Sequence, residues 1–232
     1  MSIEPSDNPP PSWLRAAGRR LGALWVTKLV GISAGMTLFF VAYFQLLHHP
    51  LRPPFVMPLT VLDRWIGFQP AALPLYLSLW VYVSLAPALI AGRRQLQALA
   101  IAALGLSVAG LGIFLVWPTA VPAMPGATWA ADSAFAFLKQ VDASGNACPS
   151  LHVAFAVLAA GVIARSLREI GAGRLPSVLN GLWCAGILWS TIATRQHVAL
   201  DVAAGALLGA AVTATYGQWL NRTARRGRAR ES

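Results

Sequence analysis

The chain has 232 residues, of which 56% are hydrophobic and only 11% are charged. A water-soluble protein of this length would need more charged residues to cover its surface, so the composition argues against a soluble protein. A net charge of +10 would suit nucleic acid, but the distribution of the basic residues, described below, indicates a membrane protein without a nucleic-acid partner.

Six apolar runs predict six membrane-spanning helices, because a helix needs roughly 20 apolar residues to cross a bilayer. In chain order the runs cover residues 29–47, 71–91, 98–117, 151–164, 179–194 and 198–219. The fourth and fifth runs are short. We interpret them as spans that extend into their polar flanks, with re-entrant or buried helices as the alternative. The fold class we expect is all-α, an integral membrane six-helix bundle.

The predicted organisation is one membrane domain over residues 29–220 between two basic cytoplasmic tails, residues 1–28 and 221–232. After the first run we expect an irregular loop with a short interfacial helix over residues 59–66. Residues 118–149 form the longest non-apolar stretch, and connections of this length are usually functional. In the last run, Gly205 and Gly209 are spaced for close packing against another helix.

The basic residues predict how the chain crosses the membrane. With a cytoplasmic N-terminus, six crossings place fourteen of the 18 Lys and Arg residues on the cytoplasmic side. Membrane proteins carry such an excess on that side. We therefore expect a multi-pass protein of a bacterial inner membrane with both termini cytoplasmic, whose basic C-terminal tail contacts anionic membrane lipids.

The four histidines all map to the extracytoplasmic side. His197 and Asp201 are four residues apart, which places two side chains on the same face of a helix. A carboxylate there can accept a hydrogen bond from one imidazole nitrogen and leave the other as a nucleophile or base. Asp201 begins an apolar run, where an ionised group needs a partner, and His197 and Arg195 are the candidates. The alternative is a charge pair that only caps the helix.

A second polar cluster, from Asn146 to His152, directly precedes the fourth run. Ser150 suits a helix N-cap, and Pro149 stops the helix from extending backward. A helix N-terminus favours an anion such as phosphate, and His152 in its first turn could donate a proton to a leaving oxygen. Taken alone, the cluster is better explained as an ordinary capped helix. However, two crossings separate His152 from His197, so both histidines can meet at one face.

The two clusters resemble signatures of the type-2 phosphatidic acid phosphatase superfamily. The second signature of that family, Pro-Ser-Gly-His or Pro-Ser-Leu-His, is matched by Pro149-Ser150-Leu151-His152. The third, Ser-Arg, five residues, His, three residues and Asp, is matched by Ser190-Thr191, His197 and Asp201. The resemblance covers roughly residues 63–218. Further positions resemble the branch that includes inositol phosphorylceramide synthase-like phosphotransferases: Leu151, Asp142, Asn146 and Gln196.

The resemblance implies a lipid phosphatase or phosphotransferase with a phosphorylated lipid as substrate. His197 would attack phosphorus and form a phosphohistidine, with Asp201 holding the imidazole. His152 would protonate the leaving oxygen and then activate water or an acceptor hydroxyl. No cofactor or metal would be needed. Phosphate-binding roles would fall to Ser150, Ser190, Arg195 and Lys139.

Two positions depart from the family pattern. Thr191 stands where the third signature has arginine, and Arg195 could supply the missing charge. Ala123 stands about where the first signature has arginine. Lys139, Arg64 or Arg52 could compensate there. Phosphoryl transfer relies on positive charge around the equatorial oxygens, so the second hypothesis is a catalytically lapsed membrane protein that binds lipid phosphate.

Two other functions have less support from the sequence. His152 and His197 could be ligands of a haem, or contact a quinone, inside a helical bundle, but the chain has no haem attachment motif. A metal hydrolase would need carboxylates beyond Asp201, and Asp63, Asp132 and Asp142 show no ligand spacing.

Overall fold

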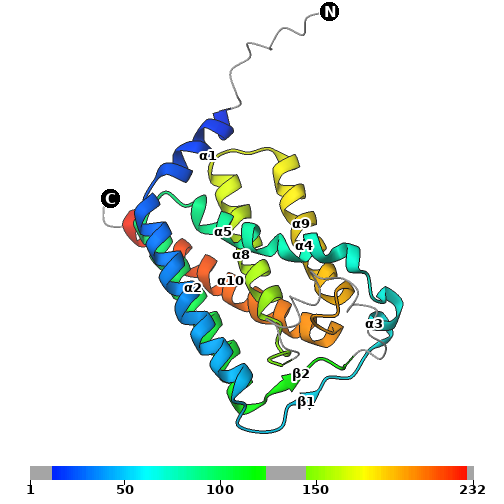
Figure 1. Cartoon of the computed structure of the whole chain (residues 1–232). Coiled ribbons are helices and arrows are strands. Elements are labelled where there is room, and N and C mark those ends of the chain that lie inside the picture. The colour runs from blue at the N-terminus through cyan, green and yellow to red at the C-terminus, as the bar shows by residue number, and fades with distance from the viewer. Residues whose placement is uncertain (1–11, 124–144, 229–232) are drawn as a thin grey trace, which may run out of the picture.

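The computed structural model describes residues 12–123 and 145–228 (Figure 1). Helices make up nearly all of the regular structure in these residues. In chain order the elements are α1 (Ser12–Gly22), α2 (Trp25–His48), β1 (Phe55–Val56), α3 (Val61–Ile66), the 3₁₀ turn η1 (Pro70–Ala72), α4 (Leu73–Leu77), α5 (Leu79–Ala88), α6 (Arg93–Val116), β2 (Thr119–Ala120), α8 (Leu151–Glu169), α9 (Arg174–Ala193) and α10 (Ala199–Arg228).

Within the described residues, six stretches are long and apolar enough to cross a membrane. They are α2, the combined stretch Pro70–Ala88, α6, α8, α9 and most of α10. The two short apolar runs thus belong to full-length helices of 19 and 20 residues, α8 and α9, which extend into their polar flanks as predicted. The molecule is an all-α membrane helical bundle, as the sequence predicts.

Helix α8 lies at the centre of the bundle. In the most apolar 18-residue stretch of α8, 56% of the residues are buried. The corresponding share in α2 is 6%, so α2 lies at the rim of the bundle. Small and branched side chains allow this central position, because Ala154, Ala156, Val153 and Val162 of α8 are all fully buried. The neighbouring helices consequently hold the N-terminus of α8 in place.

Helix α10 packs on α8 almost backbone to backbone. A Cβ atom at Gly205 would clash with the carbonyl oxygen of Ser150, and one at Gly209 would lie 2.5 Å from the carbonyl oxygen of Ala154. Only glycine permits this approach, so the close packing predicted from these two glycines is confirmed. It brings the start of α10 next to the start of α8.

The second span is not one continuous helix. It is divided into η1, α4 and α5, and the division between the two helices falls at Ser78. The Ser78 hydroxyl donates to the carbonyl of Leu75 at 2.6 Å and accepts from the indole N–H of Trp183 in α9 at 2.8 Å. These bonds fix the orientation of α4, which carries Tyr76 toward the interior.

The C-terminal ends of α2, α6 and α9 gather at one end of the bundle, where Figure 1 shows β1, β2 and α3. The two short strands are parallel, with Phe55 opposite Thr119 and Val56 opposite Ala120. The short helix predicted over residues 59–66 is α3, which Thr60 caps. Helix α1 and the turn between α8 and α9 lie at the opposite end.

Candidate functional site

The N-terminus of α8 is built as the sequence predicts. Ser150 is the N-cap, and its hydroxyl accepts a hydrogen bond from the backbone N–H of Val153 at 3.3 Å. The loop before it is bound to other elements: the N–H of Ser150 donates to the carbonyl of Asp201 at 3.0 Å, and the N–H of Cys148 donates to the hydroxyl of buried Thr119 at 2.8 Å. His152 follows in the first turn, half-buried.

His197 does not lie on α10, which corrects the expectation that His197 and Asp201 share one helix face. The N–H groups of Gln196 and His197 both donate to the carbonyl of Thr191 at 3.1 Å, so the chain forms a turn and α10 begins only at Ala199. The pair still meets, because the Asp201 carboxylate reaches back. Its Oδ2 accepts from the N–H of Val198 at 3.0 Å and lies 3.6 Å from Nδ1 of His197.

The turn and the α8 N-terminus bring the two histidines together. The ring centroids of His152 and His197 are 5.6 Å apart, with 59° between the ring planes. His197 is 6% exposed and Asp201 is fully buried. The two imidazoles therefore share one space at the end of the bundle that carries β1, β2 and α3.

Tyr76 is part of this site, although nothing in the sequence analysis assigned it there. Its hydroxyl is 2.9 Å from Nε2 of His152, and the two rings lie 5.2 Å apart. Trp80, one turn later, meets the same imidazole edge to face at 6.2 Å. The available signal was a tyrosine inside an apolar run, since a buried tyrosine hydroxyl usually requires a partner.

Asp63 is a second residue that the sequence analysis did not place. It is fully buried, and its Oδ2 accepts from both the N–H and the hydroxyl of Thr60 at 2.7 Å. Its Oδ1 accepts from the N–H of Ala199 at 2.8 Å. Asp63 therefore ties α3 to the first turn of α10. The Thr-x-x-Asp pattern of a capping box was the readable signal.

Cys148 lies beside the Asp201 carboxylate. Burial, together with the negative charge of Asp201 and a hydrogen bond to it, raises the pKa of the Cys148 thiol to about 11. The thiol therefore stays protonated near neutral pH and adds polar contact to a carboxylate that has no access to water. Its high pKa and burial make it a poor nucleophile.

The structure gives less direct support for the other residues that were predicted to contact phosphate. Ser190 is fully buried, and its hydroxyl donates to the carbonyl of Ile187 at 2.7 Å within α9. Arg195 lies in the turn beside His197, half-buried, with φ of 55°. Arg195 follows Thr191 by four residues, but α9 ends at Ala193, so the two residues are not one turn apart on a single helix. Lys139 lies outside the described residues, as do Asp132 and Asp142.

No group of three or more His, Cys, Asp and Glu side chains with the arrangement of a metal site occurs in residues 12–123 and 145–228. What the site contains is two imidazoles, a buried carboxylate beside one of them, a tyrosine hydroxyl on the other and a capped helix N-terminus. This combination can attack an electrophile, transfer a proton and attract an anion.

Comparison with known protein families identifies a match. The family model of the PAP2 superfamily, the type-2 phosphatidic acid phosphatases, matches residues 63–215. This range begins at Asp63 and includes Tyr76, both histidines and Asp201. No curated protein and no solved structure matches the chain. The family generally comprises phosphatases and phosphotransferases. The chain, matched over well more than half of its length, belongs to the PAP2 superfamily.

Proposed function

We propose that this protein is a membrane lipid phosphatase or phosphotransferase that works through a phosphohistidine on His197. The observation that supports the proposal most strongly is the approach of the two imidazoles to 5.6 Å, with Asp201 at Nδ1 of His197. With Nδ1 directed at the carboxylate, Nε2 is the nitrogen available to attack phosphorus. A phosphoryl group held between the two rings is within reach of both.

The reaction proceeds in two balanced steps. In the first, Nε2 of His197 forms a bond to phosphorus, the bond from phosphorus to the lipid oxygen breaks, and His152 gives that oxygen a proton. Asp201 stabilises the positive charge that develops on His197. In the second step, His152 takes a proton from water or an acceptor hydroxyl, whose oxygen bonds to phosphorus as the bond to His197 breaks.

The capped N-terminus of α8 supplies the anion-binding part of the site. Because Ser150 caps the helix and is fully buried, its role is to hold the first-turn N–H groups in place for the phosphate oxygens. Arg195 and Lys139 are the proposed cationic ligands. Ser190 would need to exchange its bond to Ile187 before it could contact phosphate.

The positive-inside bias supports an extracytoplasmic site. The starts of α8 and α10, next to which the two histidines lie, are hydrogen-bonded to Thr119 of β2 and Asp63 of α3, whereas most of the basic residues map to the other end. Leu151 and Gln196 favour the branch of inositol phosphorylceramide synthase-like phosphotransferases. Attack by an alcohol on the phosphohistidine would make the enzyme a phosphotransferase.

The test is turnover by purified full-length protein on a panel of lipid phosphates, including phosphatidic acid and a prenyl diphosphate, with and without an alcohol acceptor. We expect release or transfer of phosphate that continues in the presence of a metal chelator. His197→Ala should abolish turnover. His152→Ala should reduce it about 10²- to 10⁴-fold, the usual contribution of a general acid and base.

His49→Ala is the matched control, because His49 is exposed and lies at the same end of the bundle. This variant should retain wild-type turnover. Wild-type activity in His197→Ala would overturn the mechanism.

A second candidate function, binding of lipid phosphate without turnover, is favoured by one observation. Thr191, which replaces the arginine of the third signature, is fully buried, and its hydroxyl donates to Leu188 at 2.8 Å. No guanidinium therefore occupies that position. Saturable binding of lipid phosphate with no product from any substrate of the panel would favour this alternative.

A further inference from the structure

Helix α1 presents two chemically different faces. Ser12, Ala16, Arg19 and Arg20 follow the spacing of one helix face. Leu14 and Leu21 occupy the other face and are 43% and 51% exposed. A helix with one basic face and one uncovered apolar face is typical of a helix that lies in the interface of a membrane.

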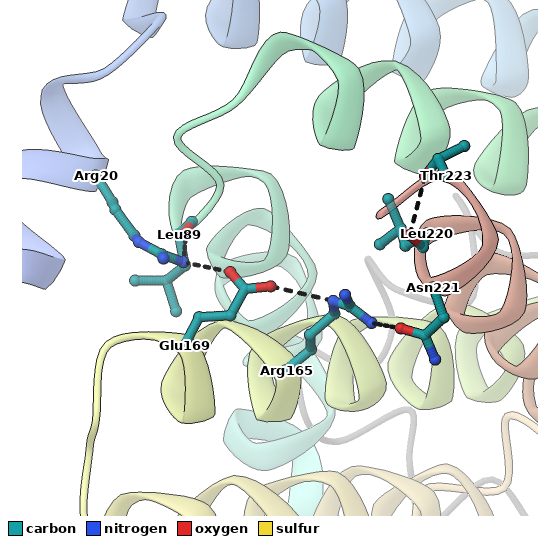
Figure 2. A network of polar contacts seen from close by, with 7 residues as sticks. All are labelled: Arg20, Leu89, Arg165, Glu169, Leu220, Asn221 and Thr223. Carbon is teal, nitrogen blue, oxygen red and sulfur yellow. Dashed lines mark hydrogen bonds and ion pairs between the residues drawn. The ribbon is translucent and has the colours of Figure 1, made fainter. Parts of the chain in front are cut away.

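Two basic side chains dock α1 onto the end of the bundle. Arg20 donates to the carbonyl of Leu89 at 3.2 Å and pairs with Glu169 at 3.1 Å (Figure 2). Lys28, buried near the start of α2, donates to the carbonyls of Arg20 at 2.7 Å and Ala88 at 2.9 Å. These contacts provide hydrogen-bond donors for carbonyls near the ends of α1 and α5 and hold α1 in one orientation.

The charges around this docking point do not cancel. Figure 2 shows the Glu169 carboxylate between Arg20 and Arg165, each 3.1 Å away, so this trio carries a net positive charge. Arg15 and Arg19 are both exposed. Neither takes part in an ion pair with any other residue in the described part of the chain. The polar face of α1 therefore carries cationic charge on Arg15 and Arg19 that no carboxylate within residues 12–123 and 145–228 pairs with.

A groove lies between α1 and the C-terminal end of α8. It has a volume of about 590 Å³ and is lined by a mixture of polar and small residues, including Ser12, Ala16, Arg19, Arg20 and Glu169. Ligand-binding clefts commonly have volumes of ~300–1,000 Å³. A hydroxyl and two guanidiniums along one wall are suitable ligands for phosphate oxygens.

We propose that α1 and this groove bind the head group of an anionic phospholipid, at the end of the bundle opposite the two histidines. Arg19 contacts the phosphate in the groove, Arg15 adds attraction one turn away, and Leu14 and Leu21 enter the lipid. The occupant is a membrane lipid because α2 begins at Trp25, three residues after α1 ends, which keeps α1 at the level of the bilayer surface.

The first test uses native mass spectrometry of the full-length protein in detergent, titrated with phosphatidylglycerol or phosphatidylcholine. In detergent there is no charged membrane surface, so the affinity depends on direct contacts, and a charge-assisted hydrogen bond from a guanidinium to phosphate contributes roughly tenfold or more. The double variant Arg15→Gln, Arg19→Gln should therefore weaken phosphatidylglycerol binding at least about tenfold and leave phosphatidylcholine binding unchanged. His197→Ala should bind phosphatidylglycerol as the wild type does, because this site is independent of the proposed function.

The matched control is Arg94→Gln, Arg174→Gln, which removes the same charge from exposed positions on α6 and α9. It should weaken binding by less than threefold. An equal loss in both double variants would show a general effect of net charge and overturn the proposal, as would no loss in either.

Hydrogen exchange on the wild type tests the proposal without a variant. In nanodiscs that contain phosphatidylglycerol, the amides of residues 12–22 should exchange more slowly than in nanodiscs of phosphatidylcholine alone. Equal exchange of α1 in the two lipids would contradict the proposal.

Discussion

The properties of His197 and His152 are set by the side chains that contact each ring. Asp201 is fully buried, and its Oδ2 both accepts a hydrogen bond from the N–H of Val198 and faces Nδ1 of His197. The same carboxylate therefore caps α10 and contacts the histidine. Asp63 caps the next residue, Ala199, from a different helix. His152 has a different partner, the hydroxyl of Tyr76. One histidine therefore faces a negative charge and the other a neutral hydroxyl, which suits a nucleophile and a proton donor respectively.

Tyr76→Phe should lower kcat about 10- to 100-fold with little change in KM, because a hydrogen bond to a group that becomes charged is worth ~1.5–3 kcal/mol. Without the hydroxyl, the His152 ring loses its orientation and the proton transfer slows. Steady-state kinetics on the preferred lipid phosphate measures both parameters.

Tyr82→Phe is the control for this prediction. Tyr82 is also a buried tyrosine of the second span, but its hydroxyl contacts the backbone carbonyl and the side-chain oxygen of Asn180, away from the histidines. Its removal should leave kcat unchanged. An equal fall in kcat for both variants would mean that Tyr76 has only a structural role.

At the scale of elements, contact between α8 and α10 positions the site. The backbone carbonyl of Asp201 in α10 accepts a hydrogen bond from the N–H of Ser150. Farther along α10, Gly205 and Gly209 lie close to the backbone carbonyls of Ser150 and Ala154 in α8. Because α8 is the central helix, α10 has no room to shift without moving the α8 N-cap. This helix pair therefore fixes the α8 N-terminus, which carries His152, against the start of α10, two residues after His197.

Gly205→Ala should destabilise the protein by about 1–3 kcal/mol, the usual effect of an extra methyl group in a packed interior. The new Cβ meets the backbone carbonyl of Ser150, which cannot rotate away. Turnover should fall as well, since Ser150 begins the helix that carries His152. Thermal unfolding in detergent and steady-state kinetics measure the two effects.

Gly217→Ala, in the same helix, provides the comparison, because a Cβ there meets nothing within 4 Å. It should leave stability equal or slightly higher, as alanine favours a helix over glycine. If the two alanine variants had the same stability and turnover, the close packing of α10 on α8 would not control the site.

The elements were largely predictable from the sequence, because they depend on local patterns. Apolar runs predict the membrane spans, and the capping residue Ser150 predicts where α8 begins. The turn that keeps His197 off α10 was not predictable, because it depends on two N–H groups that bind the Thr191 carbonyl, and the first turn of α10 also receives a carboxylate from α3. Tyr76 was missed for a similar reason: its partner lies 76 residues away along the chain. Long-range contacts of this kind leave no periodic pattern.

The whole molecule has two chemically distinct ends. One gathers both histidines, Asp201 and the N-terminus of α8. The other gathers α1, Lys28 and the pairs formed by Glu169. Six candidate spans lie between them. The proposed phosphate chemistry and the proposed attachment to anionic lipid therefore fall at opposite ends of the bundle.

The central claim is that His197 carries the phosphoryl group while His152 moves the proton. The most direct measurement is incubation of the purified protein with a lipid substrate radiolabelled at phosphorus. An alkaline quench, which preserves phosphohistidine, then allows the labelled residue to be located by mass spectrometry. The account predicts label on His197 in the wild type, none in His197→Ala, and slower loss of label in His152→Ala. Turnover with label on another residue, or with no label on any residue, would contradict it.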